Sequence, residues 1–441
     1  MNLSLVSRNR LRALLVILLG STALLSGSPA QADSWKNLLG GMDDQVYDLA
    51  VDTNGRLYAG GAFTQADVVT VYGIARWNGT SWSDLAYGMD DSVNTLVFGK
   101  NGTLYVGGQF TNAGGVAANR VAKWNGTTWS ALGSGLNQEV LALAVDSHDT
   151  LYAGGRFTQA GGTSAYYIAK WNGSAWSPLT SGTNDVVRAL TADTNGNVYA
   201  GGDFTAAGSV SASHVARWNG TDWSTLGNGT TGDVYALTMF NKRGSLYVGG
   251  NFEKAGGLVV NGIARWTGSS WAPLALGLSQ ARYVYALAFD GFGRLYAGGN
   301  FYIFTNNGPT CQDICMWSGN AWSALGDGNG AYAGMSGDVY ALVAAGSGVN
   351  MYVGGFFSQA DNIMLNRIAE WIPTPPPVPG LGSLGGVLMT VFMAASCLRQ
   401  SSSAGSGSRA TGALPNERAR GSRVGYRMRG NPRCGQDPRS S

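Results

Sequence analysis

The nine residues IARWNGTSW, from Ile74 to Trp82, recur along the chain and decide its fold. Their two tryptophans lie five residues apart, and the same spacing occurs six times, at Trp77/Trp82, Trp124/Trp129, Trp171/Trp176, Trp218/Trp223, Trp266/Trp271 and Trp317/Trp322. The first tryptophans, with Trp371 as the last of them, follow one another at intervals of 47 to 54 residues. Self-similarity at such a period is the signature of a repeat architecture.

Each repeat contains four short apolar stretches, which we expect to be strands. The first is VYDLAVD at Val46–Asp52, the second LYAGGAF at Leu57–Phe63, the third IARW, and the fourth starts at the second tryptophan. These runs are rich in β-branched and aromatic residues and are bounded by turn formers, such as Asn78-Gly79 between the paired tryptophans. The second stretch occurs seven times. The pattern predicts an all-β fold, a seven-bladed β-propeller of four-stranded blades.

Two tryptophans, Trp35 and Trp371, remain outside the pairs and lie at opposite ends of the repeat region. The seventh unit ends at Trp371 and lacks a fourth strand, whereas Ser34–Leu38 is a fourth strand without a third. Pairing of these N- and C-terminal strands closes the ring and covers two exposed strand edges. We therefore predict one propeller over residues 33–372.

The N-terminus, residues 1–32, reads as a secretory signal peptide. Arg8, Arg10 and Arg12 precede an apolar run, and Ala30-Gln31-Ala32 fits cleavage by signal peptidase. The run is short for a membrane helix, so we expect export. Residues 33–398 hold 17 basic and 24 acidic groups, a net charge of −7, which disfavours a nucleic-acid partner.

Beyond the repeats, the composition changes three times. Residues 373–380 are a proline-rich linker, and residues 381–398 are an apolar run of 18 residues, at the lower edge for a membrane span. This run is interpreted as a membrane anchor or a cleavable surface-sorting segment. Residues 399–441 carry nine arginines and form a basic tail that we expect to be disordered.

If the first strand of each unit lies nearest the axis, the strand 2–3 and strand 4–1 connections share one face. Insertions in the sixth and seventh units fall on this face, which we therefore expect to bind a ligand. Charged residues lie beside the inner strands on the same face: Asp44, Asp91, Glu139, Asp185, Asp233, Arg282 and Asp338. They either form a partial ring that attracts a cation or a basic ligand, or are polar turn residues that face solvent. No cofactor is expected, and calcium is left open because chelation needs several oxygens around one point.

Cysteines and histidines offer little catalytic chemistry. Cys311 and Cys315 are close enough for a disulfide, with a buried free thiol at Cys315 as the alternative. The two histidines, His148 and His214, fall in a turn and a loop.

The recurring LYVGGxFTxAGGxxxxxIAKWNGxxWxxLGxG resembles the secreted propeller repeats of Rax2-like cortical polarity-marker proteins and the delta-60 repeats of bacterial surface proteins. The resemblance covers nearly all of residues 34–371. It implies an extracytoplasmic propeller without an established catalytic motif, so no site residue is carried over.

We expect an exported, surface-attached monomer that binds or adheres to an extracellular carbohydrate or protein and is not an enzyme. One alternative is a polysaccharide hydrolase or lyase that uses the carboxylates of Asp44, Asp91 and Asp233. The other is a purely structural surface-layer component.

Overall fold

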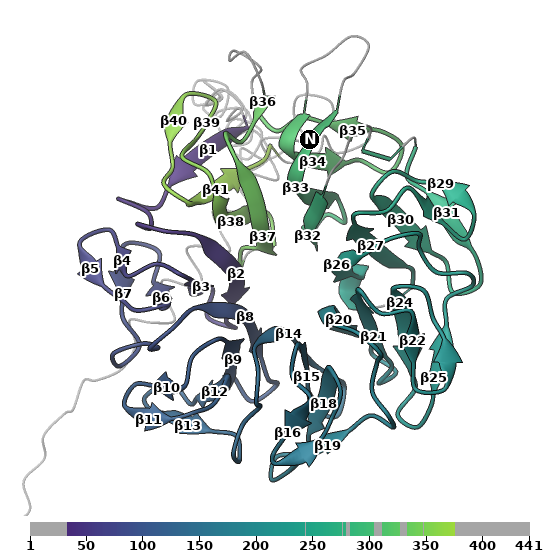
Figure 1. Cartoon of the computed structure of the whole chain (residues 1–441). Coiled ribbons are helices and arrows are strands. Elements are labelled where there is room, and N and C mark those ends of the chain that lie inside the picture. The colour runs from purple at the N-terminus through teal and green to yellow at the C-terminus, as the bar shows by residue number, and fades with distance from the viewer. Residues whose placement is uncertain are drawn as a thin grey trace, which may run out of the picture. The chain divides into compact units, whose positions relative to one another are not determined.

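The computed structural model describes residues 33–374, except 243, 276, 279–282, 304–310, 327–332 and 347. Within these residues, seven antiparallel sheets of four strands stand around a central axis (Figure 1). The predicted seven-bladed propeller is confirmed. The expected signal peptide, the apolar run 381–398 and the basic tail lie outside the described residues.

The first four blades are nearly identical. Counted outward from the axis, their strands are β2 (Val46–Val51), β3 (Leu57–Gly61), β6 (Ile74–Trp77) and β7 (Trp82–Ser83); β8 (Val93–Phe98), β9 (Leu104–Gly108), β12 (Val121–Trp124) and β13 (Trp129–Ala131); β14 (Val140–Val145), β15 (Leu151–Gly155), β18 (Ile168–Trp171) and β19 (Trp176–Pro178); and β20 (Val187–Ala192), β21 (Val198–Gly202), β24 (Val215–Trp218) and β25 (Trp223–Thr225).

The last three blades vary more. Blade five has β26 (Val234–Thr238), the short 3-10 helix η1 (Phe240–Lys242), β27 (Leu246–Gly250), β30 (Ile263–Trp266) and β31 (Trp271–Pro273); blade six has β32 (Tyr283–Phe289), β33 (Leu295–Ile303), β34 (Cys311–Trp317), β35 (Trp322–Ser323) and the added β36 (Ala333–Gly334); blade seven has β37 (Asp338–Ala344), β38 (Met351–Phe356), β41 (Ile368–Ile372) and β1 (Ser34–Asn37).

Six of the strand 2–3 connections, expected to be plain loops, fold into two-stranded ribbons. They are β4 (Gln65–Ala66) with β5 (Val69–Thr70), β10 (Asn112–Ala113) with β11 (Val116–Ala117), β16 (Gln159–Ala160) with β17 (Thr163–Ser164), β22 (Ala206–Ala207) with β23 (Val210–Ser211), β28 (Lys254–Ala255) with β29 (Leu258–Val259), and β39 (Gln359–Ala360) with β40 (Ile363–Met364). The turn in the second ribbon shows why they form. Gly114 and Gly115 have φ angles of 55° and 86°, the left-handed conformation that a two-residue hairpin turn requires.

The paired glycines of each second strand let the blades approach one another closely. A Cβ on Gly60 would lie 2.5 Å from Cγ1 of Val93, in the inner strand of the next blade. The same valine contact recurs at all seven interfaces, including Gly298 with Val339 and Gly354 with Val46. The first glycine of the pair is therefore a packing requirement of the ring.

The outer tryptophans link neighbouring blades by a hydrogen bond. Trp129 Nε1 donates to the carbonyl oxygen of Leu85, in the preceding blade, at 2.8 Å. Equivalent bonds from the other paired tryptophans occur at five further interfaces, namely Trp82 to Leu38, Trp176 to Leu132, Trp223 to Leu179, Trp271 to Leu226 and Trp322 to Leu274.

The terminal strand pair, β1 with β41, completes blade seven as predicted (Figure 1). Trp35 lies opposite Trp371 in the register, and the two rings are 4.8 Å apart between centroids. Lys36 Nζ lies 3.2 Å from Glu370 Oε2. Both tryptophans are buried, and blade seven therefore has a continuous outer edge built from the two ends of the propeller.

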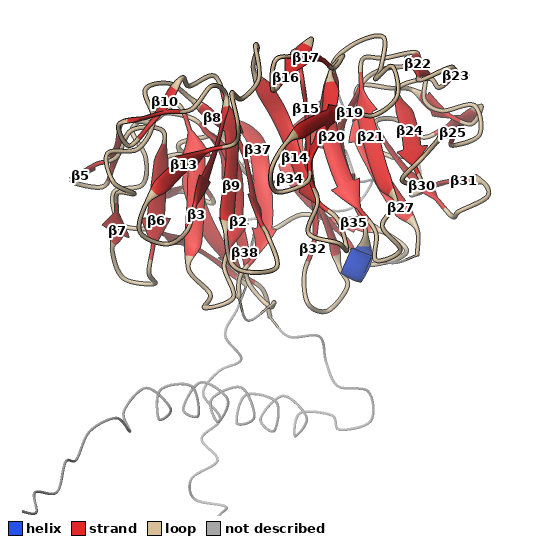
Figure 2. Cartoon of the chain, turned by 90° about the horizontal axis from the view of Figure 1, so that it is seen from below, coloured by secondary structure: helices blue, strands red, loops and turns tan. Residues whose placement is uncertain are grey.

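The two faces of the ring differ. The tight-turn face carries the strand 1–2 and strand 3–4 turns and η1, whereas the loop face carries the strand 4–1 connections and the ribbons (Figure 2). β1 begins and β41 ends on the tight-turn face, where the Thr374 N–H donates to Asp33 Oδ1 and Arg294 Nη1 donates to the Thr374 carbonyl at 3.5 Å. The polypeptide thus enters and leaves the propeller on the tight-turn face.

Candidate functional site

The inner strands enclose a central cavity of about 210 Å³. In each inner strand, the residue after the valine that contacts the neighbouring blade lines this cavity. One side chain per blade therefore faces the axis: Tyr47, Asn94, Leu141, Arg188, Tyr235, Tyr285 and Tyr340. Four of these are tyrosines from neighbouring blades five, six, seven and one. The cavity wall is therefore aromatic on one side and mixed on the other.

The four tyrosines, which we call the tyrosine arc, form a row of neighbouring rings that are tilted or edge to face relative to one another. The centroid distances are 5.7 Å from Tyr235 to Tyr285, 5.4 Å from Tyr285 to Tyr340 and 6.0 Å from Tyr340 to Tyr47. Tyr283 stacks parallel to Tyr285 at 5.5 Å. Burial, followed by the nearby charge of Asp338, raises the pKa of Tyr285 to about 12, so this phenol is neutral at physiological pH.

The acidic residues that the sequence singled out occupy two neighbouring positions rather than one. Asp44, Asp91 and Asp185 are exposed, and each carboxylate accepts the N–H of the following residue, at 2.8, 2.7 and 2.7 Å. This is the local hydrogen bonding of turn residues. Their part in ligand binding stays a prediction.

Glu139, Asp233 and Asp338 lie one residue closer to the inner strand and have side-chain partners. Glu139 pairs with Arg156 at 2.5 Å. Asp233 accepts the Tyr235 hydroxyl at 3.3 Å, and Asp338 accepts the Tyr340 hydroxyl at 3.1 Å. Arg282, the remaining predicted residue, lies outside the described residues.

Two further carboxylates were not singled out from the sequence, and one of them, Asp48, lines the central cavity. Asp48 accepts the N–H of Leu96 in the next blade at 2.7 Å, and burial raises its pKa to about 6. Asp313 is buried on β34, where burial and the nearby charge of Asp338 raise its pKa to about 7. Asp48 stands within the VYDLAVD stretch, where the other units have alanine or threonine; that break in the repeat is the signal that could have identified it.

Cys311 and Cys315 are joined as a disulfide within β34, with Cα atoms 5.8 Å apart. Asp313 between them has a φ of 59°, which bends the strand and brings the two cysteines together. In the third strands of the other blades, alanine occupies the position of Cys315.

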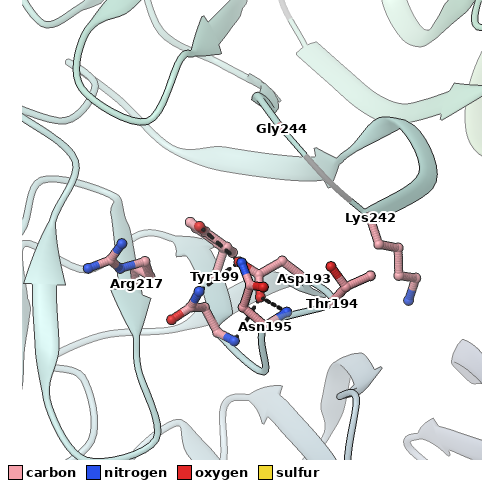
Figure 3. Close-up of a pocket in the computed structure, with 8 residues that line it drawn as sticks. Asp193, Thr194, Asn195, Tyr199, Arg217, Lys242 and Gly244 are labelled. Atoms are coloured by element: carbon pink, nitrogen blue, oxygen red, sulfur yellow. Dashed lines mark hydrogen bonds between the residues drawn. The ribbon is translucent and has the colours of Figure 1, made fainter.

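A cavity of about 560 Å³ on the tight-turn face lies between blades four and five (Figure 3). Asp193 in its wall already accepts the N–H groups of Asn195 and Asn197, both at 2.9 Å. Arg217 and Lys242 extend from opposite ends of the group and do not converge (Figure 3). The cavity thus lacks a focused set of charges.

In the part of the chain that the structure describes, no three His, Cys, Asp or Glu side chains gather in a way that could hold a metal ion. Nor does any helix among these residues have the length and apolar character needed to cross a bilayer.

Comparison with known proteins supports the fold. Residues 69–225 and 164–257 match the Rax2 C-terminal β-propeller domain. No individual curated protein matches the chain.

Two solved structures are similar in fold. The crystal structure of the RRP9 WD40 repeats aligns with a TM-score of 0.52 at 14% identity, over 78% of this chain and 99% of that chain. The extracellular domain of BT4673 from B. thetaiotaomicron, described as a hybrid two component system, aligns with a TM-score of 0.52 at 13% identity. That alignment covers 77% of this chain and 39% of the other, so this chain spans about two fifths of it. At these identities the likeness concerns the fold alone. The chain contains a β-propeller that resembles the Rax2 C-terminal propeller domain.

Proposed function

We propose that the protein is an exported, surface-attached binding module whose loop face holds an extracellular carbohydrate or protein. The observation that carries the proposal is the position of the chain ends. Both ends of the propeller lie on the tight-turn face, so an attachment through the C-terminal segment leaves the loop face free for a ligand.

Exposed apolar side chains gather in the elements of the loop face. Tyr302 at the end of β33 and Phe356 at the end of β38 are 42% and 46% exposed, and Met364 in a ribbon is 60% exposed. Aromatic side chains supply large contact areas at binding surfaces. The insertion in blade six follows Tyr302 in sequence, and the insertion before blade seven ends at Asp338, which lies opposite Phe356 in the register of β37 and β38. Residues 304–310 and 327–332 of these insertions lie outside the described part.

Export is supported by the N-terminal segment 1–32 and by the fold comparison with an extracellular domain. The surface attachment rests on the apolar run 381–398 alone.

A second candidate function is cleavage of a polysaccharide, as a hydrolase or a lyase. The observation that favours it is the buried carboxyl of Asp313 on blade six, because burial, with a smaller effect of the charge of Asp338, raises its pKa to about 7, a value that suits general acid–base chemistry. Turnover of a polysaccharide that disappears in Asp313→Asn would establish this function.

The binding proposal is tested with glycan and protein arrays probed with the exported chain. We expect the double variant Tyr302→Ala, Phe356→Ala to lose at least about tenfold in affinity, as central aromatic contacts do. The matched control is Phe240→Ala, because Phe240 is an aromatic residue of the tight-turn face that is 38% exposed. Equal loss in both variants, or no loss in either, would remove the loop face as the binding surface.

A further inference from the structure

We propose that the mouth of the central cavity at the tyrosine arc holds an ammonium group, carried by a free amine or by a lysine side chain. The inference rests on the proposed function, which places the ligand on the loop face, and it adds the chemical class of the group that enters the channel. It is carried by the arrangement of tyrosines and carboxylates around the cavity.

The arc presents ring surfaces from four adjacent blades to one cavity. Each blade from Tyr235 to Tyr47 places one aromatic ring at the axis, and neighbouring ring centroids are 5.4 to 6.0 Å apart. The face of an aromatic ring carries partial negative charge and attracts a cation within about 6 Å of its centroid. Several such faces around one cavity favour a compact cation.

The polar atoms of the arc are set up as acceptors. The hydroxyls of Tyr235 and Tyr340 donate their protons to Asp233 and Asp338, so their oxygens can accept further hydrogen bonds but have no proton left to donate. Asn300 also donates to Asp338, at 2.6 Å, which fixes this carboxylate at the mouth. A ligand group that meets this wall must therefore donate hydrogen bonds, carry positive charge, or both.

The one arginine of the described wall is already neutralised. Arg188 forms two hydrogen bonds with Asp203, at 2.5 and 2.7 Å. Its guanidinium also lies 5.3 Å from the Tyr235 centroid, which shows that a cation is accommodated against this end of the arc. His214 Nδ1 lies 3.5 Å from Asp233 and is partly buried outside the arc. Among the described residues, the other charged side chain of the wall is Asp48, and Arg156 at the loop-face end of β15 is paired with Glu139.

The size of the cavity limits what enters it. A volume of about 210 Å³ is below the ~300–1,000 Å³ of pockets that enclose a whole drug-sized molecule. We therefore expect a small head group or a side chain inside the channel and the rest of the ligand on the loop face. The net charge of −7 over residues 33–398 steers a cation toward the protein.

The experiment is a calorimetric titration of the exported chain with n-butylammonium, with 1-butanol as a neutral molecule of the same size, and with a lysine-containing peptide. We expect saturable binding of the cation and not of the alcohol. Tyr285→Leu should weaken it about 5- to 30-fold, because the ring face is lost, and Tyr285→Phe should stay within about twofold. Asp338→Asn should also weaken binding, and Tyr87→Leu, at a tyrosine that is 84% exposed and absent from the cavity wall, serves as the control.

Preference for the peptide over n-butylammonium would identify a lysine side chain as the source, and the reverse a free amine. Equal binding of the neutral alcohol, absence of binding by every cation, or a Tyr285→Leu variant that stays folded and binds as the parent does would each overturn the inference. If only the Tyr302 and Phe356 variant then affects array binding, the proposed function stands and the ammonium site falls.

Discussion

The interface between blades six and seven differs from the other six interfaces of the ring. The inner contact, a valine against a glycine of the neighbouring blade, is present at all seven. The outer hydrogen bond, from a tryptophan Nε1 to a leucine carbonyl, is present at six. At the seventh, Trp35 occupies the outer tryptophan position, and its buried Nε1 has no hydrogen-bond partner in the described structure.

The difference shows that the ring closes by packing within blade seven. Its outer strand comes from the other end of the chain, and it is held by the Trp35–Trp371 contact and by four residues of paired backbone. Elsewhere the outer strand is a covalent continuation of its blade and carries the bond to its neighbour as well. In the other blades, the outer strand is thus held both by the covalent chain and by its hydrogen bond to the next blade. In blade seven the outer strand lacks both, so closure depends on the packing of its side chains and on its backbone pairing.

The largest expected effect follows from removing one of the two closing tryptophans. Trp371→Ala or Trp35→Ala, at residues that are 2% and 5% exposed, should destabilise the whole ring by about 3–5 kcal/mol. Thermal and urea unfolding measure it. Melting that matches the parent would mean that the terminal strand pair does not close the ring.

A smaller effect distinguishes the two kinds of interface. Trp129→Phe keeps an aromatic ring but removes the donor to Leu85, whereas Trp35→Phe removes an N–H that has no partner. Both tryptophans are 5% exposed, so the cavities left are comparable. We expect Trp129→Phe to be the more destabilising by about 0.5–1.5 kcal/mol, the net value of one hydrogen bond. The reverse order in urea unfolding would contradict the account of the outer contact.

A third comparison uses pH. Burial raises the pKa of Asp48 to about 6, above its usual value of 3.8, so the folded state holds a proton there that the unfolded chain has lost. Stability from this group therefore falls as the pH rises from about 4 to 6. Blade two has Thr95 at the equivalent position, and its hydroxyl accepts the Leu143 N–H of the next blade at 3.2 Å.

We expect the hydroxyl of the Asp48→Thr variant to accept the Leu96 N–H in place of the carboxylate, as Thr95 does for Leu143. The melting temperature of the variant, relative to the parent, should rise between pH 4 and pH 8, because only the parent loses stability over this window. Asp313 is present in both proteins and cancels. A difference that is constant with pH would show that Asp48 does not titrate as its surroundings indicate.

The smallest effect concerns the ion pair of the terminal strands. Lys36 is half exposed, so Lys36→Met should cost less than about 1 kcal/mol, and the cost should vanish at high salt. A larger effect that is insensitive to salt would make this pair, and not the tryptophans, the main support of closure.

Much of the architecture could be read from the sequence because tryptophan spacing and glycine pairs repeat with the blades. The unpaired Trp35 and Trp371 were enough to predict closure, and the first strand predicted at Val46–Asp52 is β2 within one residue. The ribbons could not be separated from loops, because their strands are two residues long and carry no apolar alternation.

The site was harder to predict than the fold. The direction of each side chain near the axis depends on a β-bulge at the start of the inner strand, such as the register shift between Val46 and Asp48. Tyr47, at this bulge, faces the axis, and no local sequence pattern predicts the bulge. For the same reason, the predicted carboxylates divide into exposed turn residues, partners of the tyrosine arc and, at Glu139, the partner of an arginine.

The central claim, that the two ends of the propeller pair within one blade, is tested most directly by a designed cross-link. Lys36 and Glu370 face each other in the register of β1 and β41. We expect the double variant Lys36→Cys, Glu370→Cys to form an intramolecular disulfide, identified by mass spectrometry of the joined peptides, and to melt at a higher temperature than its reduced form. Two free thiols in folded, monomeric protein, or cross-links only between different molecules, would contradict closure of the ring by its own ends.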